Sequence, residues 1–212
     1  MRKREMQRTR SIAEQRKFYN KIYEDTAKSS RKIANARLRK GLYKDLFEEF
    51  LVLLEYSEIK YSNDTNIKFK WVGDEKQGDI LNYDGIICRE NEIIERVEIT
   101  CPLISKKDKD NAIELNERGY TSVEIGNLET ALMEIKEKTE GIANKKNNKN
   151  TYDNTITLVI YLEDYIHFFH DTEMCEDMLE QIKGSLKQIK YKFKNVYVLQ
   201  NINNNKSLIK IM

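Results

Sequence analysis

The run Thr155–Leu162, TITLVIYL, constrains the fold most, because a strand that is apolar on both faces must be covered on both sides. A helical pattern over about Glu173–Lys190 follows it, and then a second strand, Asn195–Leu199. A strand, a helix and a strand in this order predict a parallel crossover. We therefore expect an α/β fold in which strand 155–162 lies in the middle of the sheet.

The segment Tyr83–Pro102 predicts a β-hairpin. Two runs rich in β-branched residues, Tyr83–Cys88 and Ile93–Thr100, are joined by a polar turn. Asp84 opens the first strand and Glu98 lies near the end of the second. Because side chains alternate along a strand, Glu98 shares one face with the threonine two residues later, opposite the apolar face.

The length of the turn decides whether the two carboxylates meet. A two- or four-residue turn centred on Glu90–Asn91 would place Asp84 opposite Val97, with Glu98 on the other face. A three-residue turn or a β-bulge would place Asp84 directly opposite Glu98. Two carboxylates on neighbouring strands are natural ligands for a hard cation such as Mg²⁺ or Mn²⁺. The sequence leaves both registers open.

The segments Asp84–Ile87 and Val97–Thr100 together resemble the core of the PD-(D/E)xK, or restriction-endonuclease-like, nuclease superfamily. In that superfamily an Asp begins one strand and a Glu-x-Lys motif lies on the next. The resemblance covers about the central half of the chain. It implies metal-dependent hydrolysis of DNA phosphodiester bonds, with Mg²⁺ or Mn²⁺ held by Asp84, Glu98 and the backbone carbonyl of Ile99.

Two positions depart from the superfamily pattern. Tyr83 stands where Pro is usual, and Thr100 stands where the catalytic Lys is expected. Thr100 would then orient water, and a lysine of the predicted strand Ile67–Val72, Lys68 or Lys70, would supply the positive charge that stabilises the attacking hydroxide and the pentacoordinate phosphate. An ordinary exposed lysine face of an edge strand is the alternative.

Apolar stripes at helical spacing predict helices over about Arg31–Tyr56, Asp110–Arg118 and Asn127–Lys146. The polar run Asn144–Asn150 predicts a loop. In some members of the superfamily the helix before the sheet adds an acidic ligand, but solvation or ion pairing is the expectation here for Glu48, Glu49 and Glu55. The complete prediction is a restriction-endonuclease-like three-layer α/β sandwich with a mixed central sheet and a basic helical N-terminal arm.

Positive charge is concentrated in the first forty residues. Fourteen basic and four acidic residues give residues 1–40 a net charge of +10, so the rest carries −8 for an overall charge of +2. We therefore divide the chain into a basic helical arm, 1–40, and an α/β domain, 41–212. Such an arm suits the phosphate backbone of DNA, which it would hold without reading sequence. The alternative is an arm that packs on the acidic body of the chain or on a partner.

Composition and motifs argue against several other classes of protein. No run approaches the ~20 apolar residues of a membrane span, and the basic N-terminus lacks the apolar core of a signal peptide. Three cysteines without metal-ligand spacing fit a reducing cytoplasm. No glycine-rich phosphate loop or serine elbow is present. The expectation is thus a Mg²⁺-dependent deoxyribonuclease. The alternatives are a catalytically inactive nuclease-like module that binds nucleic acid or a protein partner, a homodimer among them, and a regulatory protein with a docking arm.

Overall fold

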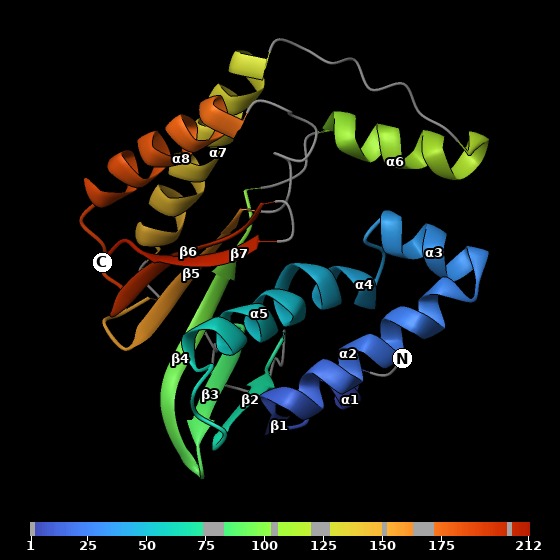
Figure 1. Ribbon diagram of the computed structural model, residues 1–212, viewed down its shortest axis with the longest axis horizontal. Coiled ribbons are helices and arrows are strands. Elements are labelled where there is room, and N and C mark those ends of the chain that lie inside the picture. Colours follow the sequence, from blue (N-terminus) through green and yellow to red (C-terminus); the bar gives the residue numbers. More distant parts are fainter. Residues whose placement is uncertain are drawn as a thin grey trace.

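One mixed sheet with helices on both faces forms the body of the protein (Figure 1). The computed structural model describes residues 3–73, 83–102, 106–119, 128–149, 152–162, 172–202 and 205–212. Its strands are β1 (Arg10–Ser11), β2 (Ile67–Trp71), β3 (Gly85–Arg89), β4 (Glu92–Thr100), β5 (Ile156–Leu162), β6 (Asn195–Ile202) and β7 (Asn205–Lys210). They follow one another across the sheet in sequence order. Strands β1 to β4 are antiparallel, β4, β5 and β6 are parallel, and β7 is antiparallel to β6.

The helices are α1 (Lys3–Met6), α2 (Ile12–Ala27), α3 (Ser30–Arg37), α4 (Leu42–Asp45), the π-helical turn η1 (Leu46–Phe50), α5 (Leu51–Lys60), α6 (Lys106–Arg118), α7 (Leu128–Asn147) and α8 (Thr172–Lys187). Helices α2 and α5 cover one face of the sheet, and α7 and α8 cover the other (Figure 1). This arrangement confirms the predicted three-layer α/β architecture with a mixed sheet.

Strand β5 explains why both faces must be covered, because every one of its residues is buried. Val159 and Tyr161 point into the core beneath α5, whereas Leu158, Ile160 and Leu162 point into the core beneath α7 and α8. The predicted central strand and the parallel crossover through α8 to β6 are both confirmed.

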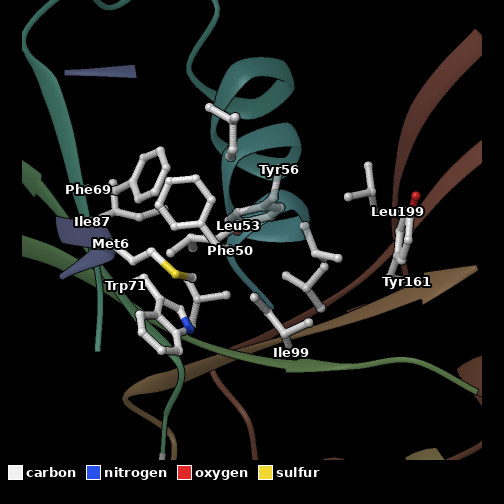
Figure 2. Close-up of a cluster of buried hydrophobic side chains, with 14 of the residues drawn as sticks. Met6, Phe50, Leu53, Tyr56, Phe69, Trp71, Ile87, Ile99, Tyr161 and Leu199 are labelled. Atoms are coloured by element: carbon white, nitrogen blue, oxygen red, sulfur yellow. The ribbon is translucent and has the colours of Figure 1, made fainter. Parts of the chain in front are cut away.

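The core beneath α5 joins the N-terminal segments to the hairpin (Figure 2). Phe50, Leu53 and Tyr56 descend from η1 and α5 onto the sheet, where they meet alternate residues of β2 and β3. The rings of Phe50 and Phe69 lie 5.8 Å apart. Trp71, fully buried, closes this core next to the end of β3.

Residues 3–27 pack on the body of the protein through β1, Met6 and α2. Strand β1 pairs with β2, and Met6 is fully buried. Gln15, also fully buried, donates hydrogen bonds from Nε2 to the carbonyl oxygens of Arg8 and Phe69, both at 3.0 Å. The helical character predicted for this segment is confirmed in α2 and α3. Helix α3 buries none of its residues.

The prediction of one continuous helix over Arg31–Tyr56 is wrong. The chain leaves the helix after α3, at Arg39 and Gly41, whose φ angles are 49° and 58°. It then re-enters through α4, passes through the π-helical turn and continues in α5 to Lys60. The apolar stripe was read correctly, but the left-handed backbone at these two residues has no signal in a helical period.

Glu55 of α5 gives the first testable prediction, because it is a carboxyl inside the core. It is 3% exposed, its Oε1 lies 2.7 Å from Lys206 Nζ, and its Oε2 is buried without a hydrogen-bond partner among the described residues. Burial raises the pKa of Glu55, and the Lys206 ammonium lowers it less. A carboxyl whose pKa rises on folding costs no stability below its unfolded pKa, near 4.5, and destabilises the folded state increasingly as pH rises through the folded pKa.

Glu55→Gln is therefore expected to raise the unfolding free energy at pH 7 by about 1 kcal/mol, the lower end of the cost of an unsatisfied buried polar group. Urea unfolding at pH 7 and at pH 4 measures this, and the gain should disappear at pH 4. Glu58→Gln, which removes the partner of Arg16, is the matched control and should not gain stability. A variant at position 55 that is less stable at pH 7 would show that the pair with Lys206 outweighs the burial cost.

Candidate functional site

The β3–β4 hairpin contains the register shift that brings the two predicted carboxylates together. Its turn is two residues long, Glu90–Asn91, and Glu90 has a positive φ of 56°. A β-bulge between Ile87 and Cys88 leaves Ile94 of β4 without a cross-strand partner. The register beyond the bulge, extended one residue past the start of β3, places Asp84 opposite Glu98. A two-residue turn alone would place Asp84 opposite Val97, and the bulge shifts the register by the one residue that places it opposite Glu98.

Asp84 is fixed at the start of β3 by hydrogen bonds to the neighbouring strand. Its N–H donates to the carbonyl oxygen of Val97 at 2.8 Å, and the N–H of Ile99 donates to its Oδ2 at 2.7 Å. Close packing of α5 on the next residue adds to this, since a Cβ built on Gly85 would lie 2.3 Å from Leu53 Cδ2. Glycine at this position therefore lets the helix approach the strand directly beside Asp84.

Glu98 is a buried carboxylate that two side chains from the opposite layer reach. It is 5% exposed. Its Oε1 accepts a hydrogen bond from the Tyr152 hydroxyl at 2.6 Å and also contacts the Lys146 ammonium. Burial raises the pKa of Tyr152, and the Glu98 charge raises it further, so the phenol stays protonated and donates. Among the described residues, none donates a hydrogen bond to Glu98 Oε2.

Glu49 of the π-helical turn is the third carboxylate near this point. Its Oε2 accepts a hydrogen bond from Trp71 Nε1 at 2.8 Å. It also lies close enough to Asp84 to raise the pKa of that carboxyl. Single π-helical turns inside α-helices are frequent at functional sites. The sequence analysis expected Glu49 to be solvated or paired, and its proximity to Asp84 adds it to the site.

The three carboxylates make the site strongly acidic. Burial raises the pKa of Asp84 well above its usual value, and the charges of Glu98 and then Glu49 raise it further. The Ile99 N–H and the Lys146 ammonium oppose this shift. Converging carboxylates that repel one another are the electrostatic pattern that a divalent cation relieves.

We tested whether these residues fit a metal ion. Asp84, Glu98 and Glu49 provide the oxygen donors that Mg²⁺ prefers, and this ion needs only one or two protein carboxylates besides water. In the part of the chain that the structure describes, no three Asp, Glu, His or Cys side chains already form a coordination set. Asp84 and Glu98 are therefore the ligand candidates. Ile99 contacts the site through its N–H, and a role for its carbonyl oxygen stays a prediction.

The other predicted residues lie on the same face of the sheet. Thr100 is two residues beyond Glu98, 7% exposed, and pairs with Ile160 of β5. Lys70 of β2 lies opposite Ile86, which is two residues from Asp84 along the same strand segment. Neither Lys70 nor Thr100 contacts the carboxylates in the described part of the chain.

The residue that sequence reasoning missed is Lys146. The helix predicted over Asn127–Lys146 is confirmed in α7, which carries Lys146 on its last turn and extends into the predicted loop Asn144–Asn150 as far as Asn147. The helix lies over the sheet face that holds Glu98, so its end reaches the carboxylate. No local pattern distinguishes this lysine from Lys145 or Lys149.

A second buried carboxylate on β4, Glu95, lies on the opposite face of the sheet and is fully engaged. Its Oε1 accepts from Tyr56 at 3.0 Å, Lys60 at 2.6 Å and Thr157 at 2.6 Å. Its Oε2 accepts from the Tyr61 hydroxyl at 2.7 Å. Four donors on one carboxylate leave little room for a ligand, so Glu95 stabilises the packing of α5 on the sheet.

Comparison with known proteins gave no match among protein-family models, curated proteins or solved structures. Among the described helices, none combines the length and the apolar composition needed to cross a membrane. The function assigned to the site therefore depends on its geometry and on the residues that form it.

Proposed function

We propose that this protein is a divalent-metal-dependent nuclease that hydrolyses DNA phosphodiester bonds at Asp84 and Glu98. The observation that carries the proposal is the β-bulge, which sets these two carboxylates opposite each other with an ammonium group beside them. The order of a three-stranded antiparallel unit, a helical crossover and a parallel strand also agrees with the core that the PD-(D/E)xK resemblance implies.

Asp84 and Glu98, with the Ile99 carbonyl, would hold Mg²⁺ or Mn²⁺, and Glu49 stands close enough to add an outer carboxylate. When bound, the ion would neutralise this cluster and lower the pKa of a nearby water molecule. The reaction is an in-line displacement: the water oxygen bonds to phosphorus while the bond from phosphorus to the leaving sugar oxygen breaks. The water loses a proton to solvent, and the leaving oxygen takes one up. The Thr100 hydroxyl would orient the water.

The DNA backbone would lie on the segment from α3 to α4. Residues 30–44 contain six basic side chains and no acidic one, and the segment leads directly into the turn that carries Glu49. Phosphate contacts of this kind are independent of sequence. We place the protein in the cytoplasm, where reduced thiols such as Cys88 and Cys101, which form no disulfide, persist.

Cleavage of labelled duplex, single-stranded and branched DNA, with Mg²⁺, Mn²⁺ or a chelator, tests the proposal. We expect cutting that requires the metal and stops with the chelator. No cutting of any substrate would overturn the proposed activity.

Thr100 in place of the superfamily's lysine favours a second candidate, a catalytically inactive nuclease-like module that binds nucleic acid or a protein partner. Salt-sensitive DNA binding without cleavage would support a nucleic-acid-binding module. Absence of DNA binding would favour a protein partner, a second copy of the chain included.

A further inference from the structure

We infer that Lys146, at the end of α7, is the cationic catalytic residue of this site and takes the place of the lysine absent at position 100. The inference rests on the proposed nuclease function. It is carried by the contact between the Lys146 ammonium and Glu98 Oε1, the carboxylate that the motif lysine would accompany.

The surroundings of Lys146 hold its ammonium at this carboxylate. Its side chain is 20% exposed and that of Glu98 is 6% exposed, so the pair lies at the rim of the buried region. Tyr152 donates to the same oxygen, and the Lys146 ammonium is 5.9 Å from the centre of its ring. An ammonium with one open side can contact a carboxylate of the protein and an anionic substrate together.

Lys149 shows that this placement is specific. Its ammonium lies 5.7 Å from the centre of the same Tyr152 ring, yet it makes no contact with Glu98 within the described residues. Two lysines of similar local sequence thus share an aromatic neighbour, and one of them reaches the carboxylate. Lys149 is therefore a matched control for charge and location.

Thr100 leaves β4 without the lysine of the Glu-x-Lys motif, and Lys146 provides an ammonium group in its place. Thr100 lies on the face of β4 that Glu98 also occupies, and this face is covered by α7. A lysine at position 100 would start two residues from Glu98 on the same face of β4, within reach of that carboxylate. With threonine on the strand and Lys146 on the helix, one ammonium group lies at the carboxylate. In the Glu-x-Lys motif the strand itself provides that ammonium group.

The ammonium acts by charge. In the free protein it balances the charge of Glu98. With a phosphodiester bound, it would stabilise the negative charge on the attacking oxygen and on the pentacoordinate phosphorus as the bond to the leaving sugar oxygen breaks. It donates hydrogen bonds and transfers no proton, so the balance of the hydrolysis is unchanged.

The test compares Lys146→Met, Lys149→Met and the double variant Thr100→Lys/Lys146→Met with the wild-type protein. Lys146→Met should reduce single-turnover DNA cleavage by about 100-fold or more, as loss of one charge-stabilising donor does. Lys149→Met should cleave within a few-fold of wild type. The double variant, with the lysine returned to the strand, should recover at least about tenfold of the loss.

Mn²⁺ binding by titration calorimetry gives a readout independent of cleavage. Because Lys146→Met removes a cation from Glu98, this variant should bind Mn²⁺ at least as tightly as wild type. Weaker Mn²⁺ binding with no rescue in the double variant would overturn the inference, because it would show that the lysine only positions Glu98. If Lys146→Met alone does not fold, the double variant decides: a folded protein that cleaves supports the inference, and a folded one that does not overturns it.

Two further outcomes separate this inference from the proposed function. If Lys146→Met cleaves DNA at the wild-type rate, the proposed role of Lys146 is overturned and the proposed nuclease function is retained. A wild-type protein that binds Mn²⁺ and cleaves no DNA would overturn both.

Discussion

Asp84→Asn and Glu98→Gln are each expected to reduce metal-dependent DNA cleavage by about a thousandfold. Both changes keep the shape of the side chain and remove the charge that would hold the cation. Single-turnover cleavage at saturating Mg²⁺ measures the effect, and Mn²⁺ titration should show weaker binding in both variants. Cleavage that survives both changes would place the activity elsewhere in the chain or in a contaminant.

Glu95→Gln is the matched control, because Glu95 is a buried carboxylate on the same strand but on the opposite face. Loss of its charge weakens a site with four donors, one of them the Lys60 ammonium. We expect this variant to lose about 1–3 kcal/mol of stability and to retain cleavage within a few-fold. If the change at position 95 reduced cleavage more than the change at position 98, the active site would lie on the face of the sheet that holds Glu95 and not on the face proposed here.

The stability of Asp84→Asn without metal separates a functional role from a structural one. Burial and the neighbouring carboxylates raise the pKa of Asp84 in the folded protein. Ionisation of Asp84 therefore destabilises the folded state at a pH above the pKa of an ordinary carboxyl and has no effect on stability below it. The amide should therefore be at least as stable as wild type at pH 7 in the presence of a chelator, and the difference should vanish below pH 4. Added Mg²⁺ should raise the melting temperature of wild type and not of the variant. A variant that melts lower without metal would indicate that Asp84 is a structural residue.

Local periodicity explains what could be predicted from the sequence. The two-residue alternation in β4 and the predominantly apolar run of β5 are properties of adjacent residues, so the hairpin, the central strand and the crossover were predictable. The register between Asp84 and Glu98 was not, because it depends on the bulge at Ile87 and Cys88, and the alternation of residues in the two strands does not mark a bulge. Strand β1 was missed because its partner, β2, is distant in sequence. Strand β7 pairs with the strand just before it, but it begins with Asn205 and Lys206, which are poor strand formers.

The placement of the candidate site residues was predictable to the same extent, whereas their role stays a prediction. Asp84, Glu98 and Thr100 belong to one hairpin, and a motif over adjacent strands identified them. Lys146 reaches Glu98 from a helix 48 residues away in the chain, and Glu49 enters the site because of a π-helical turn. Both are consequences of how the helices pack on the sheet. The sequence around a lysine in a polar run does not predict which carboxylate that lysine contacts in the folded protein.

Neutralising Arg31, Lys40 and Lys44 together is expected to weaken DNA binding by at least about tenfold near physiological salt and to lower the salt slope by roughly 3, since each phosphate contact contributes about 0.9. All three side chains are exposed, lie in the acid-free segment 30–44 and have no partner among the described residues. Fluorescence anisotropy of labelled duplex DNA at several salt concentrations measures both quantities. The variant Asp84→Asn, in which the proposed cleavage should be lost, can serve as the background, so that cleavage does not interfere.

The control removes the same charge from α2 and its C-cap residue, where Lys17, Lys21 and Lys28 are also exposed. Their helix carries Glu14, Glu24 and Asp25 on its exposed surface, so its lysines lie in a field of mixed sign. Because the two triple variants have equal net charge, a general electrostatic attraction would weaken binding equally in both. A larger loss from residues 31, 40 and 44 would locate the DNA backbone on α3 and α4, next to the turn that carries Glu49. Equal losses would show that the positive N-terminal region attracts DNA without directing it to the carboxylates, and a slope unchanged in both would exclude phosphate contacts at either surface.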